Sequence, residues 1–198
     1  MTSAPTARPR IVAVSGSPTN PSRTTALAAH VADELAQAID GDVTVISLGP
    51  LLADLGAGVY RPDVGPGARA ALDEVEAADV LIVGSPAYRA TFTGLFKLFF
   101  DHIEQYALVD TPVILTATGG SERHALLVEH QMRPLFGFFQ ALTLPLGIYA
   151  SEADFTDYRV SSHDLADRIS SAVRRATPVV RSSLGHAPRG PVANPAWA

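Results

Sequence analysis

Short apolar runs and amphipathic stretches alternate along this chain, and this alternation constrains its fold more than any other feature. Five runs have the length and composition of strands: residues 11–14, 43–46, 80–83, 113–116 and 147–149. Helical patterns follow at 27–39, 68–78, 122–140 and 162–176, and in the first of them Leu27, Val31, Leu35 and Ile39 recur every four residues. Strands that alternate with helices in this way form a parallel sheet covered on both faces.

The number of strands narrows the topology further. The run at 80–83 is aliphatic and mostly β-branched, as expected of a central strand with helices on both sides. Five strands favour the flavodoxin-like α/β fold, a doubly wound five-stranded parallel sheet in the order 2-1-3-4-5. We expect one domain over residues 10–176, after an N-terminal extension over 1–9. From Thr177 the composition turns to Pro, Gly, Ala and Arg without periodicity, so a disordered tail is expected over 177–198.

The sequence contains no cysteine. This excludes disulfides, thiolate catalysis and thiolate-bound iron–sulfur clusters, so any redox chemistry requires a bound cofactor. The net charge is −5 and no basic cluster alternates with aromatic residues, which argues against nucleic acid as a partner. No apolar run approaches the ~20 residues that cross a bilayer, and no signal-peptide pattern opens the chain. We therefore expect a cytoplasmic protein with no membrane partner.

The loops after the first, third and fourth predicted strands share one edge of such a sheet, where ligands of this fold bind. In the first loop, at 15–25, Ser17, Ser22 and Thr24 supply hydroxyls before a helix N-terminus, which favours an anion. Ser15 and Arg23 lie in the same loop. The loop has neither a Walker pattern nor G-x-G-x-x-G, which favours a single terminal phosphate. The alternative interpretation is ordinary N-capping by Ser22 or Thr24.

The other two loops are also unusual in composition. In the loop at 84–94, Tyr88 and Phe92 can stack against a flat heteroaromatic ligand, or they only cover the end of the sheet. Lys97 follows as the only lysine among 15 Lys and Arg residues, and it is either a required point charge or an ordinary surface residue. In the loop at 116–124, Gly119 and Gly120 allow close approach of the backbone to a planar ligand, or a positive φ.

These loops carry three motifs, G-S-P-x-x-x-S-R-T-x-x-L, S-P-x-Y-x-x-x-x-x-G-L-x-K and T-G-G-S, which resemble the NADPH-dependent FMN reductase family. The resemblance extends over about residues 10–176. Within it, the segments at 118–126, 129–136, 139–141 and 143–147 closely resemble the reductases of two-component methanesulfonate and alkanesulfonate monooxygenase systems. Nothing beyond Ser182 has a counterpart in the resemblance.

The resemblance implies a specific activity: hydride transfer from NADPH or NADH to FMN, after which the reduced flavin passes to a separate monooxygenase. By the same resemblance, Ser17, Ser22, Arg23 and Thr24 hold the FMN phosphate. The flavin ring lies between two further groups, Pro86, Ala87, Tyr88 and Arg89 on one side and Thr118, Gly119, Gly120 and Ser121 on the other. Hydride transfer between stacked rings requires alignment rather than an acid or a base, so no side chain is expected to be strictly catalytic. Two alternatives remain: a quinone or azo reductase that retains its FMN, and a non-enzymatic flavin-binding carrier.

Pro134 interrupts the periodic pattern at 122–140, so a kink or a π-bulge is expected at about 130–133. Similar reductases carry a one-residue π-insertion in the matching helix, at a subunit interface beside the flavin, and His130 lies where that residue would be. The alternative is a plain proline kink with His130 at the surface. His124 and His130 are six residues apart and face different sides of a helix, so no metal site is expected.

Two apolar segments bear on the oligomeric state. Residues 95–100 and 135–139 contain more large aromatic side chains than one face of a sheet easily covers. Such an excess indicates a face that a second subunit covers. We therefore expect a homodimer or a homotetramer with flavin sites near the interface.

Overall fold

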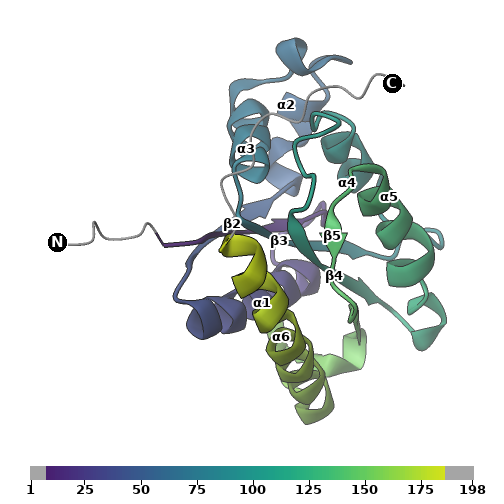
Figure 1. Ribbon diagram of the computed structural model, residues 1–198. Helices are drawn as coiled ribbons and strands as arrows, with labels where there is room; N and C mark the ends of the chain where they lie inside the picture. Colours follow the sequence, from purple (N-terminus) through teal and green to yellow (C-terminus); the bar gives the residue numbers. More distant parts are fainter. Residues whose placement is uncertain (1–7, 186–198) are drawn as a thin grey trace, which may run out of the picture.

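The computed structural model describes residues 8–185, which form a parallel sheet with helices on both faces (Figure 1). Its strands are β1 Arg10–Ser15, β2 Asp42–Ser47, β3 Val80–Pro86, β4 Pro112–Gly119, β5 Leu142–Thr143 and β6 Ile148–Ser151. They are ordered β2-β1-β3-β4-β5, and β6 also pairs with β4. The predicted flavodoxin-like order 2-1-3-4-5 is therefore confirmed.

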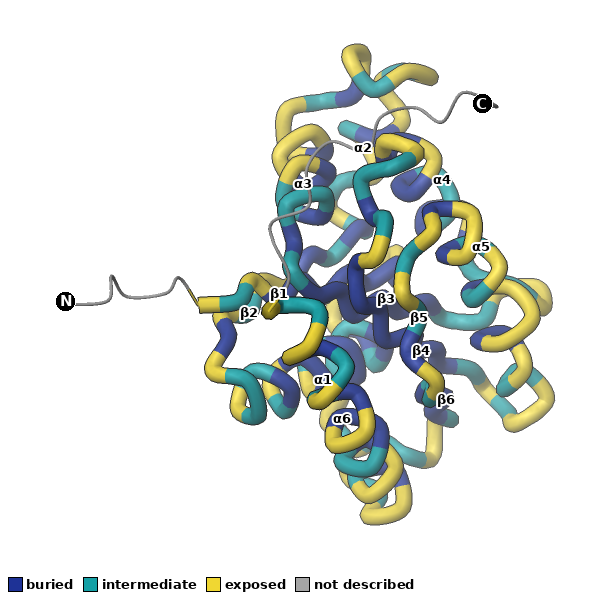
Figure 2. The backbone as a smooth tube through the Cα atoms, in the orientation of Figure 1, coloured by how far each residue is buried: buried dark blue, intermediate teal, exposed yellow. Residues whose placement is uncertain are grey.

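Two helical layers cover the sheet. On one face α1, Arg23–Ile39, lies beside α6, His163–Leu184, and their apolar sides join the odd-numbered residues of β1 in one core. The other face carries α2 Leu52–Leu55, α3 Pro66–Glu76, α4 Gly94–Phe100 and α5 Arg133–Phe138. Figure 2 shows the buried residues concentrated on the sheet and on the inward sides of these helices. Both faces of β3 are buried, which explains its aliphatic sequence.

The helices α1 and α4 each begin at a residue whose polar side chain caps them. The Ser22 side chain accepts the N–H of Thr25 at the start of α1, and the Thr93 side chain accepts the N–H of Phe96 at the start of α4. At the end of α1, Asp40 takes a left-handed conformation with φ 56°. These caps place the loops before α1 and α4 at the carboxyl ends of β1 and β3.

The fifth strand differs from its predicted form. Instead of one strand at 147–149, two short strands, β5 and β6, pair one after the other with β4. The N–H of Leu144 still donates to Val113, but Pro145 has no N–H and interrupts the ladder. Arg133 donates to the carbonyls of Leu144 and Pro145 across this break.

The helix expected at 122–140 consists of three different segments. A 3₁₀ turn, Glu122–His124, comes first; a π-helix, Val128–Met132, runs directly into α5 at Arg133. The predicted π-bulge before Pro134 is thus confirmed. His130 lies within the π-helix and its side chain is exposed.

The expected end of the last helix was wrong. It does not stop at Ala176 but continues through Thr177 and Pro178 to Leu184, so the described part of the predicted disordered tail is helical. The apolar spacing is the physical reason, because Val180 is fully buried one turn after Ala176. Residues 186–198 of that tail, and residues 1–7 of the predicted N-terminal extension, lie outside the described residues.

The aromatic side chains that suggested a subunit interface mostly pack inside the chain. Phe96, Phe100, Phe136 and Phe139 are buried, and their rings contact one another between α4 and α5. Phe138 is the exception, at 61% exposure. A single chain therefore covers most of this aromatic cluster, contrary to the expectation.

Candidate functional site

The three loops meet in one pocket at the carboxyl edge of the sheet. Its volume is about 270 Å³. Its lining comes from all three loops and from the segment after β6: Ser17, Thr19, Pro21, Ser22, Arg23, Thr24, Pro86, Ala87, Tyr88, Thr118, Gly119, Gly120, Ser151, Glu152 and Tyr158. The predicted convergence of the loops is confirmed, while the binding role of each residue remains a prediction.

The first loop presents hydrogen-bond donors to this pocket. Arg23 and Thr24 are the first two residues of α1, so their N–H groups have no acceptor within the helix. The Thr24 and Thr118 hydroxyls lie 2.6 Å apart and join the first loop to the end of β4. A hydroxyl has one hydrogen, so one of the two can donate to the other and the second can still donate to a ligand.

Ser15 lies beneath the loop and does not line the pocket. It is fully buried, and its Oγ accepts the Thr25 hydroxyl at 2.8 Å. The Ser17 N–H also donates to this Oγ, at 3.5 Å, so Ser15 joins the start of the first loop to the first turn of α1.

The second loop turns tightly before α4. Tyr88 and Thr91 exchange two backbone hydrogen bonds, and Arg89 and Ala90 between them have φ values of 51° and 71°. This is the geometry of a type I′ turn, which is strained for residues with a side chain. Tyr88 lines the pocket with its side chain half exposed, whereas Arg89 and Phe92 do not line it. Phe92 instead packs on Phe96, with ring centroids 5.5 Å apart.

The third loop is held close to the sheet by Tyr149. The Tyr149 hydroxyl donates to the Ser121 carbonyl at 2.5 Å, and burial raises the pKa of this phenol. A Cβ on Gly119 would overlap that hydroxyl, whereas a Cβ on Gly120 would meet nothing within 4 Å. Neither glycine has a positive φ, so this one of the two expected roles does not occur, and close packing against Tyr149 explains Gly119. Ser121 does not line the pocket.

Sequence reasoning missed the fourth wall of the pocket. Glu152 begins the 3₁₀ turn Glu152–Asp154, and Tyr158 lies in the turn between β7, Phe155–Thr156, and β8, Arg159–Val160. The Arg23 guanidinium contacts both, with Nη2 2.6 Å from Glu152 Oε1 and Cζ 5.7 Å from the Tyr158 ring centroid. The sequence did contain a signal for this wall, because the loop after the fifth predicted strand lies at the same edge of the sheet as the other three loops.

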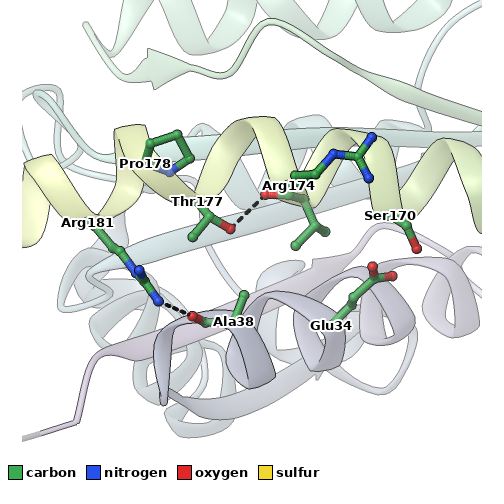
Figure 3. A pocket seen from close by; sticks show the side chains of 8 residues that line it. Glu34, Ala38, Ser170, Arg174, Thr177, Pro178 and Arg181 are labelled. Atoms are coloured by element: carbon green, nitrogen blue, oxygen red, sulfur yellow. Dashed lines mark hydrogen bonds between the residues drawn. The ribbon is translucent and has the colours of Figure 1, made fainter.

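A larger groove lies elsewhere, between α1 and α6 (Figure 3). It measures about 560 Å³, and Arg181 spans it by donating to the Ala38 carbonyl at 2.6 Å. No loop from the carboxyl edge of the sheet reaches it, so we place the functional site in the smaller pocket. Lys97 also lies outside both pockets and pairs with Asp101.

Two further site types find no support in residues 8–185. No cluster of three or more His, Asp or Glu side chains there is arranged to hold a metal ion. Within the same range, no helix is both long and apolar enough to span a bilayer.

Comparison with known proteins identifies the family. Residues 9–156 match the family model of NADPH-dependent FMN reductases. This chain belongs to the NADPH-dependent FMN reductase family. Among its FMN reductase relatives, the "FMN reductase (NADPH)" of Pseudomonas aeruginosa is 52% identical over 170 residues, which cover 86% of this chain and 91% of that protein.

A second relative is named for NADH instead of NADPH. The "NADH-dependent FMN reductase SfnE" of Pseudomonas putida is 52% identical over 169 residues, covering 85% of this chain and 91% of that protein. Among solved structures, an oxidoreductase from Corynebacterium diphtheriae superposes with a TM-score of 0.80 at 27% identity, over 89% of this chain and 99% of the other. This chain thus matches the FMN reductase family in sequence and an oxidoreductase of known structure in fold.

Proposed function

We propose that this protein is an NAD(P)H-dependent FMN reductase whose pocket at the carboxyl edge of the sheet binds the flavin. The observation that carries the proposal is the meeting of the three loops in one pocket beside the N-terminus of α1. Membership of the FMN reductase family supports the reaction. The residues that line the pocket support its assignment as the flavin-binding site.

The donors in the pocket fit a flavin monophosphate. Two backbone N–H groups at the start of α1, the hydroxyls of Ser17, Ser22 and Thr24, and the Arg23 side chain surround a space suited to one anion. The positive end of the helix dipole adds to their attraction for phosphate. A diphosphate or triphosphate site would need the longer glycine-rich loop that this sequence lacks.

The remaining residues position a flat ring. When bound, FMN supplies the redox chemistry, accepting a hydride from the reduced nicotinamide. Pro86 and Ala87 form one wall of the pocket, with the Ala87 N–H tied to the Thr118 carbonyl at 2.7 Å. Gly119 and Gly120 line the pocket beside Ala87, and a Cβ on Gly120 would meet nothing within 4 Å, so open space adjoins this glycine. Alignment of two rings requires such rigid walls and no titrating side chain.

The test is a comparison of FMN with riboflavin. We expect the purified protein to oxidise NADPH or NADH with FMN, with a lower KM for FMN than for riboflavin, because only FMN carries the phosphate that the first loop binds. Comparable KM values for the two flavins contradict the phosphate site. A stoichiometric yellow complex that survives dialysis indicates a reductase that retains FMN and uses another acceptor.

We infer that the reduced flavin is passed to a separate FMNH₂-dependent monooxygenase of the sulfonate or organosulfur type. The resemblance of residues 118–147 to reductases of such systems supports this, as does the half-exposed Tyr88 at the pocket entrance. In a coupled assay with an alkanesulfonate monooxygenase, sulfite release should depend on this protein, FMN and reduced nicotinamide. Sulfite release that is unchanged when the protein is omitted contradicts the inference.

We also infer a homodimer or a homotetramer. The segment from 126 to 142 leaves Leu126, Phe138 and Leu142 at 63%, 61% and 41% exposure, next to the π-helix. Such apolar side chains are typical of a surface that another subunit covers. Sedimentation velocity should show a species of at least twice the 20.8 kDa chain mass. A single monomeric species at micromolar concentration contradicts this.

A further inference from the structure

The pocket contains one acidic side chain in an otherwise anion-binding environment. Among the described residues that line it, Arg23 is the only cation and Glu152 is the only carboxylate. The two form an ion pair of 2.6 Å, so the cation best placed to hold a phosphate already has a partner.

The backbone that carries Glu152 is well anchored. The preceding residue, Ser151, forms a capping box with Asp154, whose carboxylate accepts the Ser151 N–H at 2.7 Å and the Ser151 hydroxyl at 3.0 Å. Arg168 donates to the Tyr149 carbonyl at 2.8 Å in the strand before it. The carboxylate is therefore presented at the pocket by a fixed turn.

Tyr158 also contacts Arg23. Its ring lies 5.7 Å from the guanidinium carbon, and both Asp157 and Tyr158 have positive φ values, 49° and 59°, in the tight turn between β7 and β8. Arg23 thus contacts both an aromatic ring and a carboxylate, and both interactions favour this position of the side chain.

We propose that Glu152 competes with the flavin phosphate for Arg23 and so weakens the binding of FMN relative to a pocket without this carboxylate. The proposal rests on the placement of the phosphate in the first loop given above. A phosphate dianion beside Arg23 must share or displace Glu152, and like charges in one partly enclosed pocket repel. The consequence is a flavin that binds through its phosphate yet leaves readily after reduction.

Neutral substitutions of Glu152 test the competition. For Glu152→Gln and Glu152→Ala we expect the Kd for FMN, measured by quenching of flavin fluorescence, to fall about fivefold, while the Kd for riboflavin stays within twofold. That change corresponds to about 1 kcal/mol. The FMN dissociation rate in stopped-flow should fall in parallel, and the gain should shrink as salt is raised. The matched control is Glu34→Gln, which removes the same charge from α1 in the distant groove and should leave both Kd values unchanged.

The outcomes separate this proposal from the assignment of the site. Unchanged or weaker FMN binding in both Glu152 variants overturns the competition, and so does equal tightening for riboflavin. Arg23→Gln tests the site itself, because it should weaken FMN binding at least fivefold without affecting riboflavin. If Arg23→Gln leaves FMN binding unchanged, the phosphate placement fails and the role of Glu152 fails with it.

Discussion

The hydroxyls of Thr24 and Thr118 lie 2.6 Å apart although 94 positions separate them in the sequence. One belongs to the first turn of α1 and the other to the end of β4, and both line the pocket. Both residues are almost fully buried, so the contact holds the predicted phosphate loop against the predicted ring edge. The first loop and the end of β4, the two halves of the proposed flavin site, are therefore directly connected.

Thr24→Val should weaken the binding of the FMN phosphate without affecting the binding of the rest of the flavin. The substitution keeps the shape of the side chain but removes a donor to a charged group, so we expect the KM for FMN to rise about tenfold. The KM for riboflavin should stay within twofold, which serves as the internal control. Equal losses for the two flavins indicate a distorted pocket instead of a lost phosphate donor.

Thr118→Val tests the coupling of the two loops. It leaves the Thr24 hydroxyl without its partner, which should lower the free energy of unfolding by about 1 kcal/mol. The double variant Thr24→Val/Thr118→Val should lose less than the sum of the single variants in urea unfolding, since neighbouring partners are not additive. Strict additivity contradicts a direct bond between the hydroxyls.

Gly119→Ala should destabilise the protein, because the new methyl group would overlap the Tyr149 hydroxyl. We expect a loss of about 1–3 kcal/mol in unfolding free energy, typical of overpacking. Gly120→Ala is the matched control, since a Cβ there meets nothing within 4 Å, and it should change stability far less. Combining Gly119→Ala with Tyr149→Phe should recover part of the loss. A Gly119→Ala variant as stable as Gly120→Ala contradicts the close packing.

The Glu129–Arg133 pair should make stability depend on pH. The Arg133 hydrogen bonds lower the pKa of Glu129 below its ordinary 4.5. A carboxyl whose pKa is lowered by folding stabilises the protein at pH values above its unfolded pKa, and this contribution is lost as the pH falls through the folded pKa.

Glu129→Gln measures that contribution. At pH 7 we expect it to lower the unfolding free energy by about 0.5 kcal/mol, a small value because the Glu129 side chain is 47% exposed. The difference from the unmodified protein should shrink as the pH falls through the lowered pKa of Glu129, because the carboxyl then becomes neutral like the glutamine amide. A difference that grows on acidification contradicts the assigned direction.

Pro178→Ala should stabilise the protein. Pro178 lies inside α6 and cannot donate to the Arg174 carbonyl, whereas alanine can complete the helix. We expect a gain of about 1 kcal/mol, seen as a higher Tm. Arg181→Gln, three residues further along α6, is the comparison variant. It should lower the Tm, because it removes the hydrogen bond to the Ala38 carbonyl. A lower Tm for Pro178→Ala shows that the ring packs favourably in the groove between α1 and α6.

The sheet order and the meeting of the loops were predictable from sequence because both follow from the alternation of strands and helices. The π-helix was predictable because Pro134 removes a backbone donor at a fixed position. The end of α6 was not, since Pro178 and the change of composition suggested a tail, while the burial of Val180 depends on α1 lying beside it. Tertiary packing decided that boundary.

Within the site, the hydroxyl-rich loop was predictable, but the ion pair was not. Arg23 and Glu152 are distant in sequence, and only the folded sheet brings α1 and the end of β6 to the same edge. Arg89 and Ser121 belong to the right loops but do not line the pocket, because the direction of a loop side chain depends on local turns, and Ser15 is the buried last residue of β1. The type I′ turn at Arg89 and Ala90 shows this, since nothing in those residue types favours positive φ.

The divided outer strand has a consequence for the behaviour of the protein in concentrated solution. An uninterrupted sheet margin offers a row of free amides onto which another chain can stack, which is how ordered aggregates grow. Here β5 has two residues and β6 has four, with Pro145 between them and Arg133 occupying the carbonyls at the break. The same irregularity that disrupts the regular fold on this side therefore protects this edge of the sheet against edge-to-edge polymerisation.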